Sequence, residues 1–444
     1  MSAATPARRT LRYIVQPARR IGGELAVPGD KSISHRALML GGIADGPTMI
    51  TGFLASEDCL ATLAALQQLG VRIERDGANV TVHGVGTDGL RAPRAPLHMG
   101  NAGTAMRLSM GLLAAQRFDS TLIGDESLTR RPMERVAAPL RLMGADIETH
   151  DGCPPVEIRG GRPLMAIDYT LPVASAQVKS ALLLAALQAR GLTRVTEPGV
   201  SRDHTERMLG MFGARLARER CTVALEGGQS LRGTALRVPG DFSSAAFFLV
   251  AGCLGATEGL MLRGVGVNPT RAGLIELLKK MGADIRIAMT ESLGEPVADI
   301  EVRASRLRGI EVPRSIVPNV IDELPVFFIA AACADGESLV RGAEELRLKE
   351  SDRLAAMSAG LARLGVEHEL LADGMRIRGR SEAFTGGTID SHGDHRIAMA
   401  FAVASLRTGA PIEIEDVANV ATSFPTFVEL SQRAGLPLSL KAEG

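Results

Sequence analysis

The chain has 444 residues, and its 50 lysines and arginines balance 50 aspartates and glutamates. About 150 residues per domain predicts roughly three domains with cores of their own, which excludes a disordered chain and a small disulfide-stapled scaffold. Zero net charge and 3% aromatic residues argue against a nucleic-acid-binding protein and against an anionic membrane surface as a partner. Any charged ligand must therefore be recognised locally.

Cysteine usage and apolar runs predict a soluble, cytoplasmic protein. The five cysteines form no Cys-x-x-Cys pair, which is typical of reduced thiols and not of disulfides or a zinc site. The longest apolar runs, such as residues 245–256, are shorter than the roughly 18 residues of a membrane span. Residues 1–20 have five arginines but no apolar signal segment, and we expect them to form a frayed tail.

One pattern recurs along the chain: a helical segment ends on Leu-x-x-apolar-Gly and alternating apolar residues follow at once. A helix needs a residue with positive φ to end in this way. The glycines are Gly70, Gly144, Gly213, Gly282, Gly365 and Gly435. Asp-Gly turns at 76–77, 151–152 and 373–374 predict that a second strand follows.

A second, more apolar helix is expected upstream of each of these, beginning at a small polar residue of the N-cap type. The six residues are Asp30, Asn101, Ser175, Asp241, Asp322 and Asp394. Each apolar helix leads into a strand, so the unit is βαβαββ and occurs six times. This predicts an α/β protein with mixed sheets, the apolar helices inside and the amphipathic helices outside.

The ends of the repeat array predict how the units are grouped. Residues 11–15 and 24–27 resemble strands without a preceding unit, and the sixth unit lacks room for its last strand, so we expect the N-terminus to complete it. Val-Pro-Gly-Asp recurs at 27–30 and 238–241, three units apart, as two crossings of a hinge. We predict two lobes of three units around a cleft. Lobe 1 is residues 1–27 plus 240–444, and lobe 2 is residues 28–239.

The first polar motif, residues 29–36, has cations at a helix start. Lys31, Ser32 and Arg36 lie where free N–H groups and the helix dipole favour an anion. The motif is not a Walker A loop, because Asp30 separates the glycine from the lysine. Equivalent helix starts carry Asn101 and Arg107, Ser175 and Gln177, Asp322, and Arg396. Since a repeat points equivalent positions at one place, we expect these residues to meet in the cleft and bind more than one anionic group.

Other polar motifs also have a purely structural interpretation. Arg202-Asp-His-Thr-Glu206 fits a solvated capping box, and Asn268-Pro-Thr-Arg271 fits a helix start with proline in its first turn. Lys349-Glu-Ser-Asp-Arg353 is typical of a solvated ladder of ion pairs. Residues 391–396 have the composition of a metal cluster but no second group of ligands, which favours Asp394 as a helix cap.

Taken in order along the chain, the motifs resemble the 5-enolpyruvylshikimate-3-phosphate synthase family. The matching segments are residues 29–36, 100–107, 131–132, 175–179, 322–323, 349–353 and 394–396, with 202–206 and 268–271 similar to its class II branch. The resemblance implies an inside-out α/β prism and transfer of the enolpyruvyl group of phosphoenolpyruvate to the 5-hydroxyl of shikimate 3-phosphate. It implies addition, protonation at C3 and elimination of phosphate, in a monomer without metal or redox cofactor, on the shikimate pathway to chorismate and the aromatic amino acids.

The resemblance also implies roles for individual residues. Shikimate 3-phosphate would be bound by Lys31, Ser32, Arg36, Ser175, Ala176, Gln177, Arg202, Asp322 and Lys349. Phosphoenolpyruvate would be bound by Lys31, Gly103, Arg131, Gln177, Arg353 and Arg396. Asp322 would take the proton of the 5-hydroxyl and Glu350 would move the proton at C3. How acid and base work divides among Lys31, Asp322 and Glu350 stays open.

Three positions bear on how this chain differs from many members of that family. Thr422 stands where many have a lysine, and Glu345 stands where they have an asparagine, which removes one cation on the phosphoenolpyruvate side. Gly103 stands where some glyphosate-insensitive class II members have alanine. We therefore expect glyphosate to inhibit this chain.

Two alternatives remain open. UDP-N-acetylglucosamine enolpyruvyl transferase would have the same fold, but here Lys31-Ser32 replaces its Lys-Asn pair and Cys153 lies in a turn. A six-repeat binding protein without chemistry would have no need of Asp322 and Glu350 beside phosphate-binding cations.

Overall fold

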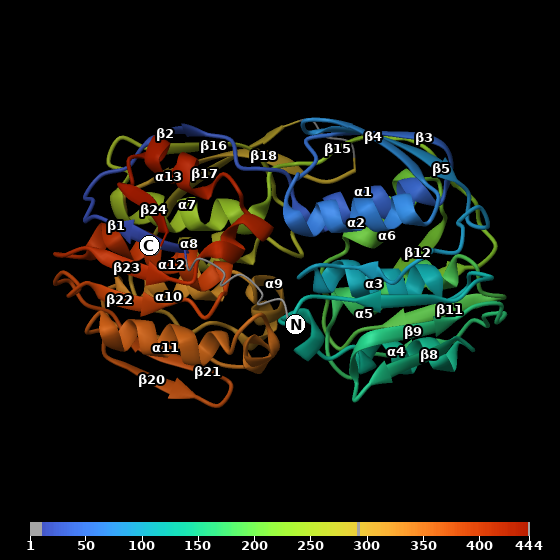
Figure 1. Ribbon diagram of the computed structural model, residues 1–444. Helices are drawn as coiled ribbons and strands as arrows, with labels where there is room; N and C mark the ends of the chain where they lie inside the picture. Colours follow the sequence, from blue (N-terminus) through green and yellow to red (C-terminus); the bar gives the residue numbers. More distant parts are fainter. Residues whose placement is uncertain (1–10, 291–293, 443–444) are drawn as a thin grey trace, which may run out of the picture.

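Six small sheets are gathered three and three in two lobes that lie side by side (Figure 1) in the computed structural model, which describes residues 11–290 and 294–442. Each lobe has its own hydrophobic core. The core of lobe 1 takes buried residues between Tyr13 and Val27 and between Phe242 and Leu438, and the core of lobe 2 takes those between Ile33 and Val238. The chain therefore passes between the lobes twice.

Lobe 2 contains three sheets, each with two helices. The first has β14 (Leu231–Arg232), β15 (Ala235–Arg237), β3 (Ala44–Thr51), β5 (Asn79–Val85) and β4 (Arg72–Asp76), with α1 (Lys31–Gly42) and α2 (Glu57–Gln68). The second has β6 (Leu97–His98), β7 (Ser120–Ile123), β9 (Cys153–Arg159) and β8 (Asp146–His150), with α3 (Gly103–Leu113) and α4 (Glu134–Leu142). The third has β10 (Asp168–Thr170), β11 (Leu192–Thr196), β13 (Thr222–Glu226) and β12 (Leu216–Glu219), with α5 (Ala176–Ala186) and α6 (His204–Met211).

Lobe 1 repeats this arrangement. Its first sheet has β2 (Gly23–Leu25), β16 (Leu260–Gly266), β18 (Val297–Arg303) and β17 (Asp284–Thr290), with α7 (Phe242–Gly255) and α8 (Gly273–Lys280). The second has β19 (Glu337–Val340), β21 (Gly374–Arg378) and β20 (His368–Leu371), with α9 (Val317–Val320), α10 (Leu324–Ala332) and α11 (Arg353–Arg363). The third has β22 (Gly387–Asp390), β23 (Ile412–Glu415), β1 (Leu11–Val15) and β24 (Leu438–Ala442), with α12 (His395–Ala404) and α13 (Phe427–Ala434).

The sheets are mixed, as the repeat predicts. In the sheet of β10, β11, β13 and β12, the first two strands are parallel and the other pairs antiparallel. Five sheets share this order, and in the sheet of β19 only isolated parallel bridges at Arg308 and Glu311 replace the first strand. The prediction of six βαβαββ units is confirmed, with this one unit incomplete.

The apolar helices lie inside and the amphipathic helices outside. Nearly every residue of α7 is buried, because a helix that is hydrophobic all round must be enclosed on all sides. By contrast, α8 buries one face and exposes lysines near its end. The predicted layering is therefore confirmed, and it directs the starts of the inner helices toward the space between the lobes (Figure 1).

Most predicted helix boundaries are confirmed. All six helix-ending glycines have φ between 75° and 99°. The side chains of Asp30, Ser175, Asp241 and Asp394 accept hydrogen bonds from the first turns of their helices. The prediction is wrong for Asn101 and Asp322, because α3 begins after Ala102 and α10 after Glu323. The two side chains instead bond Arg131 and Arg202, which leaves them in the cleft.

The N-terminal segment completes two sheets and not one. β1 lies between β23 and β24, so the N-terminus does complete the last unit, and β24 supplies the strand expected to be missing. β2 instead runs parallel to β16, and β15 takes the corresponding place beside β3. The prediction that residues 1–20 form a frayed tail is wrong from residue 11 onward, because β1 is a central strand of its sheet. Residues 1–10 and 443–444 lie outside the described part of the chain.

The two crossings touch each other at the Val-Pro-Gly-Asp segments. Gly29 and Gly240 form an antiparallel bridge, and the N–H groups of Asp30 and Asp241 donate to the carbonyls of Pro239 and Pro28, each at 2.8 Å. Arg271 lies between the two aspartates, 3.4 Å from Asp30 and 2.8 Å from Asp241. A buried charge cluster thus holds the crossings together.

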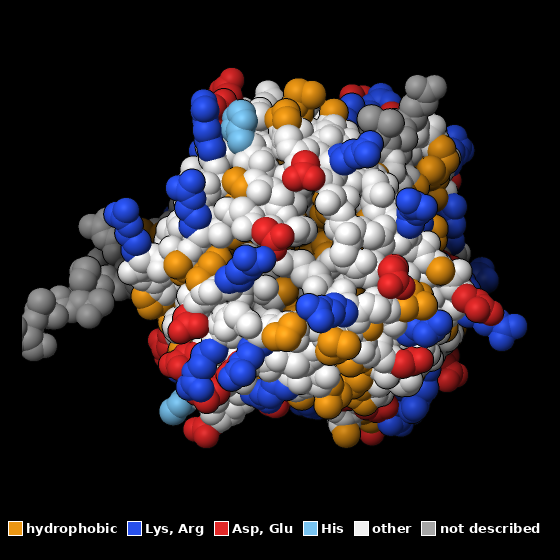
Figure 2. All heavy atoms as spheres, turned by 90° about the vertical axis from the view of Figure 1, so that its right-hand side faces the viewer, with side chains coloured by type: hydrophobic (Ala, Val, Ile, Leu, Met, Phe, Trp, Pro, Cys, Tyr) orange, Lys and Arg blue, Asp and Glu red, His pale blue; other side chains and the backbone are white. Residues whose placement is uncertain are grey.

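Three features of the structure can be compared with what the composition predicts: the cysteines, the apolar helices and the surface charge. All five cysteines are free. In the described part of the chain, no single helix is long and apolar enough to cross a membrane. One bent pair of helices, Arg314–Val320 with Leu324–Ala332, has the length and the composition of a membrane span when the two are taken together, and nothing beyond length and composition indicates one. On the outer face of lobe 2, cationic and anionic side chains are intermixed (Figure 2).

Candidate active site

The cleft between the lobes contains a cavity lined by residues of both. Every site residue expected from the sequence lines it: Lys31, Ser32, Arg36, Gly103, Arg131, Ser175, Ala176, Gln177, Arg202, Asp322, Lys349, Glu350, Arg353 and Arg396. Ten lysines and arginines line the cavity against five aspartates and glutamates, although the whole chain has no net charge. The cavity is therefore suited to ligands with several negative charges.

Lys31 is held at the start of α1. Asp30 caps the helix by accepting from the N–H of Ile33 at 2.9 Å, and the Nζ of Lys31 lies 2.9 Å from Asp58. Burial alone would lower the pKa of Lys31, but the Asp58 carboxylate outweighs it and raises this pKa. Lys31 is therefore charged at neutral pH.

Arg36 connects three helices of lobe 2. Its Nε donates to Thr205 at 2.6 Å and its Nη2 to Ser180 at 2.9 Å, while Nη1 donates to the carbonyl of Ser32 at 2.9 Å. Burial lowers the pKa of Arg36 to about 10, which still leaves it charged at neutral pH. The guanidinium is thus fixed before any ligand binds.

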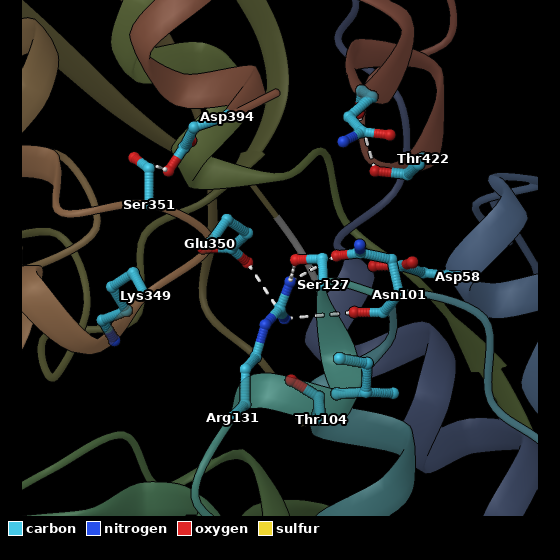
Figure 3. Close-up of polar contacts among 12 residues, drawn as sticks. Asp58, Asn101, Thr104, Ser127, Arg131, Lys349, Glu350, Ser351, Asp394 and Thr422 are labelled. Carbon is cyan, nitrogen blue, oxygen red and sulfur yellow. Dashed lines mark hydrogen bonds and ion pairs between the residues drawn. The ribbon is translucent and has the colours of Figure 1, made fainter. Parts of the chain in front are cut away.

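Arg131 lies beside the N-terminus of α3 and spans the cleft (Figure 3). Its Nη2 donates to the side chains of Asn101 at 2.5 Å and Ser127 at 3.0 Å, and its Nη1 lies 3.5 Å from Glu350 of lobe 1. A Cβ on Gly103 would lie 3.3 Å from Nη1 of Arg131, so the glycine keeps room beside this cation.

Gln177 has a fixed amide orientation in the first turn of α5. Its Oε1 accepts from Arg107 at 2.6 Å and its Nε2 donates to Thr104 at 2.9 Å. One N–H of Nε2 is donated to Thr104, so the other can be donated to a ligand. Ser175 caps the same helix.

Arg353 is the central cation of lobe 1 and is 1% exposed, so the solvated ladder proposed for residues 349–353 is wrong. Its Nε donates to Asp394 at 2.7 Å and its Nη2 to Glu350 at 2.5 Å, while Nη1 lies 3.4 Å from Asp322. Asp394 also caps α12, as expected, and among the described residues no group of three or more metal-ligand side chains could hold a metal ion.

Asp322 and Glu350 are carboxylates surrounded by cations. Burial alone would raise the pKa of Asp322, but Lys349 at 3.6 Å and Arg202 at 2.5 Å hold it well below its ordinary value. At Glu350, burial alone would likewise raise the pKa. Arg353 and Arg131 outweigh burial and hold this pKa well below its usual range. Both groups are therefore ionised at neutral pH.

Three titratable residues that the sequence analysis does not single out also line the cavity: Asp58, Arg135 and His395. Asp58 and Arg135 lie in the first turns of α2 and α4, where no motif marks them. His395 lies inside the segment 394–396, and burial together with Lys31 holds its pKa well below the ordinary value, so it is neutral. The histidine was within reach of sequence reasoning, whereas the other two were not.

The two departures seen in the sequence have different surroundings. Thr422 donates its hydroxyl to the carbonyl of Asn419 at 2.7 Å. Glu345 lies 3.1 Å from Lys349 and 3.8 Å from Arg135 of the other lobe. Thr422 in place of a lysine therefore removes a positive charge, whereas Glu345 in place of an asparagine adds an ion pair across the cleft.

The segments 202–206 and 268–271 meet across the lobes. Asn268 donates from one amide nitrogen to Asp203 at 2.7 Å and to Glu295 at 2.9 Å, and His204 lies 2.7 Å from Glu295. Asp203 and His204 are each 2% exposed, so the solvated capping box is wrong. These contacts tie the segment that carries Arg202 to lobe 1.

Comparison with known proteins gives a consistent result. The family model described as EPSP synthase (3-phosphoshikimate 1-carboxyvinyltransferase) matches residues 15–430. The 3-phosphoshikimate 1-carboxyvinyltransferases of Methylococcus capsulatus and Halorhodospira halophila are 56% and 58% identical over 431 and 426 residues, covering 96% and 95% of this chain and 98% and 96% of theirs. A solved structure of EPSP synthase from Acinetobacter baumannii is 51% identical with a TM-score of 0.88, covering 97% of this chain and 100% of that one.

Proposed function

The chain belongs to the EPSP synthase family, and on that premise we propose which of its side chains hold each substrate and which move protons. The chain is an enolpyruvyl transferase with 3-phosphoshikimate 1-carboxyvinyltransferase activity. It joins the enolpyruvyl group of phosphoenolpyruvate to the 5-hydroxyl of shikimate 3-phosphate and releases phosphate. The alternative function, that of a UDP-N-acetylglucosamine enolpyruvyl transferase, is not supported.

Shikimate 3-phosphate binds mainly to lobe 2 in this proposal. Its phosphate, carboxylate and hydroxyls face charged and polar groups at the starts of α1 and α5 and before α6, where N–H groups favour anions. The set is Lys31, Ser32, Arg36, Ser175, Ala176, Gln177 and Arg202, completed by Asp322 and Lys349 from lobe 1. The fixed guanidinium of Arg36 supports this assignment.

Phosphoenolpyruvate binds between the lobes. Its phosphate and carboxylate need several cations, and arginine forks match both groups. Arg131 of lobe 2 and Arg353 and Arg396 of lobe 1 supply these, with Lys31, Gln177 and the space beside Gly103. Because the cations come from both lobes, the substrate itself draws the lobes together.

Asp322 is the base for the 5-hydroxyl, and Glu350 carries the proton at C3 in both directions. The hydroxyl oxygen attacks C2 of phosphoenolpyruvate as its proton passes to Asp322, and Glu350 protonates C3. Glu350 then removes a C3 proton as the C2–O bond to phosphate breaks. Lys31 stays protonated beside Asp58 and stabilises charge on the phosphate.

The ion pairs of Glu350 explain how one carboxylate can act as acid and then as base. Arg353 and Arg131 keep Glu350 ionised. When phosphoenolpyruvate occupies both arginines, its negative charge opposes theirs, so the pKa of Glu350 rises and the carboxylate takes up a proton from solvent, which it then gives to C3. Departure of phosphate reverses the effect, which prepares the carboxylate for the next turnover.

One observation carries this proposal: Glu350 lies within ion-pair distance of Arg353 in its own lobe and of Arg131 in the other. The test is phosphate release from phosphoenolpyruvate with shikimate 3-phosphate or with UDP-N-acetylglucosamine as acceptor. We expect release with the first and none with the second. No release with shikimate 3-phosphate would overturn the proposal.

The same proposal includes the lobe boundaries, the cellular compartment, the oligomeric state and inhibition by glyphosate. The lobes comprise residues 1–27 plus 240–444 and residues 28–239, in keeping with the two separate cores. Five free cysteines are consistent with a reducing cytoplasm, and a cavity formed by one chain with a monomer. Glyphosate would inhibit the enzyme at the phosphoenolpyruvate site, where Gly103 leaves room beside Arg131.

A further inference from the structure

A buried charged cluster lies behind the shikimate 3-phosphate site and does not line the cavity. Lys179, on α5, has a side chain that is 4% exposed. Its Nζ lies 2.6 Å from Glu197 and 2.8 Å from Glu206, whose side chains are 3% and 2% exposed. Two carboxylates thus share one lysine in the interior of lobe 2.

Glu197 differs from Glu206 in what else it holds. Its Oε1 accepts from the hydroxyl of Ser201, and its Oε2 accepts from the N–H of Ser201 at 3.3 Å as well as from Lys179. Ser201 lines the cavity and directly precedes Arg202. Glu206 has no such contact with Ser201 in the hydrogen bonds of the described residues, and one of its oxygens is without a partner.

Arg202 depends on this support because it follows directly on Ser201, in a loop. No regular element covers residues 197–203, which lie between β11 and α6. A loop position is precise only when side chains fix its backbone, and a buried, charge-assisted hydrogen bond is the strongest such restraint available. Glu197 restrains both the backbone and the side chain of the residue before Arg202.

We propose that Glu197 is a positioning residue for shikimate 3-phosphate: anchored by Lys179, it fixes Ser201 and thereby Arg202, without touching either substrate. The proposal rests on the proposed function, which assigns Arg202 to that substrate. It predicts the larger effect on shikimate 3-phosphate, because the side chain of Glu197 bonds only Lys179 and Ser201 among the described residues, and Arg202 reaches Arg353 only indirectly, through Asp322.

Glu197→Gln is the test variant, with Glu206→Gln as its matched control. Each removes one carboxylate from Lys179 and leaves the lysine paired with the other, so neither strands an uncompensated buried charge. Glutamine is neutral and has one acceptor oxygen in place of two, so Glu197→Gln replaces the charge-assisted contacts to Ser201 with neutral hydrogen bonds at most, whereas Glu206→Gln leaves them intact.

The measurements are the dissociation constant of shikimate 3-phosphate by calorimetry and the KM of phosphoenolpyruvate at saturating shikimate 3-phosphate. We expect Glu197→Gln to raise the dissociation constant about tenfold, the loss of a hydrogen bond to a charged group, with kcat and the second KM within about twofold of wild type. Glu206→Gln should change the dissociation constant less than threefold. Equal weakening by both variants, no weakening by Glu197→Gln, or an equal rise in the KM of phosphoenolpyruvate would overturn the proposal.

Ser201→Ala supplies a second test if Glu197→Gln fails to fold. It keeps the ion pair of Lys179 with Glu197 and removes only the hydroxyl contact. It should also weaken shikimate 3-phosphate, and the double variant should be weakened no more than Glu197→Gln alone, because both cut the same connection. An unchanged Ser201→Ala, or additive effects, would contradict the route through Ser201. If wild type itself fails to bind shikimate 3-phosphate, the proposed function fails and not this inference alone.

Discussion

Arg131 and Glu350 belong to different lobes, and their nearest charged atoms are 3.5 Å apart across the cleft. The arginine is fixed by Asn101 and Ser127 (Figure 3). The glutamate is fixed by Arg353. This pair occupies the place where we put the bound phosphoenolpyruvate. Glu350 therefore balances positive charge on Arg131 and Arg353 that the bound substrate would balance in the proposed complex.

Arg131→Gln should raise the KM of phosphoenolpyruvate about 10- to 100-fold, the loss expected for charge-assisted hydrogen bonds, and leave the binding of shikimate 3-phosphate alone nearly unchanged. Steady-state phosphate release and calorimetry measure the two quantities. Arg130→Gln is the control, because Arg130 is exposed and pairs with Glu126 on the surface. A KM that stays at the wild-type value in Arg131→Gln would remove this cation from the site.

Glyphosate sensitivity should depend on Gly103. In Gly103→Ala the new Cβ would lie 3.3 Å from Arg131 and 3.4 Å from Arg107, so the arginines must shift by a few tenths of an ångström. We expect the glyphosate concentration for half-inhibition to rise about tenfold or more, with a smaller rise in the KM of the shorter substrate. Equal inhibition of the two proteins would show that this space does not admit the inhibitor.

Closure of the lobes should depend on Asn268, which links Asp203 of lobe 2 to lobe 1. In Asn268→Ala the cross-lobe contact is lost, so the open form gains population. Small-angle scattering with saturating shikimate 3-phosphate should give a larger radius of gyration than wild type. Asn79→Ala, at an exposed hairpin position, is the control and should match wild type. A variant as compact as wild type would mean that Asn268 plays no part in closure.

Acid sensitivity should depend on Asp203. Burial alone would raise its pKa, but hydrogen bonds from Arg207, Asn268 and Arg218 hold it well below the ordinary value. A carboxyl with a lowered folded pKa stabilises the fold above its unfolded pKa of about 3.9, and this contribution is lost as the pH falls through the folded value.

Urea unfolding from pH 7 down to pH 3 measures this dependence. Wild type should lose stability progressively below about pH 4, and Asp203→Asn should be less stable at pH 7 but lose less on acidification. Parallel curves for the two proteins would mean that Asp203 does not carry the effect.

Much of the fold could be predicted because each repeat marks its own ends. The six glycines with positive φ end the outer helices, and Asp30 and Asp241 cap equivalent inner helices three units apart. Local rules suffice there, since a cap and a φ value depend on a few neighbouring residues. The pairing of β2 with β16 could not be predicted in this way, because it depends on where the chain crosses between lobes.

The site was predictable where a motif marks its residues and not elsewhere. Asn101 and Asp322 were misassigned as caps because a small polar side chain can bond either its own helix or a distant arginine, and only the fold decides. Asp58 and Arg135 stand in ordinary helix turns, and it is Lys31 and Glu345, far away in the sequence, that give them partners.

Proton transfer at C3 by Glu350 is tested most directly by running the reaction in D2O and measuring deuterium at C3 of the product. Addition followed by elimination turns C3 into a methyl group, so wild type should place solvent deuterium there. Glu350→Gln should cut kcat by about 100-fold or more while still binding shikimate 3-phosphate, and exposed Glu344→Gln should behave as wild type. Product that carries no deuterium, or a Glu350→Gln variant with the wild-type rate, would contradict this mechanism.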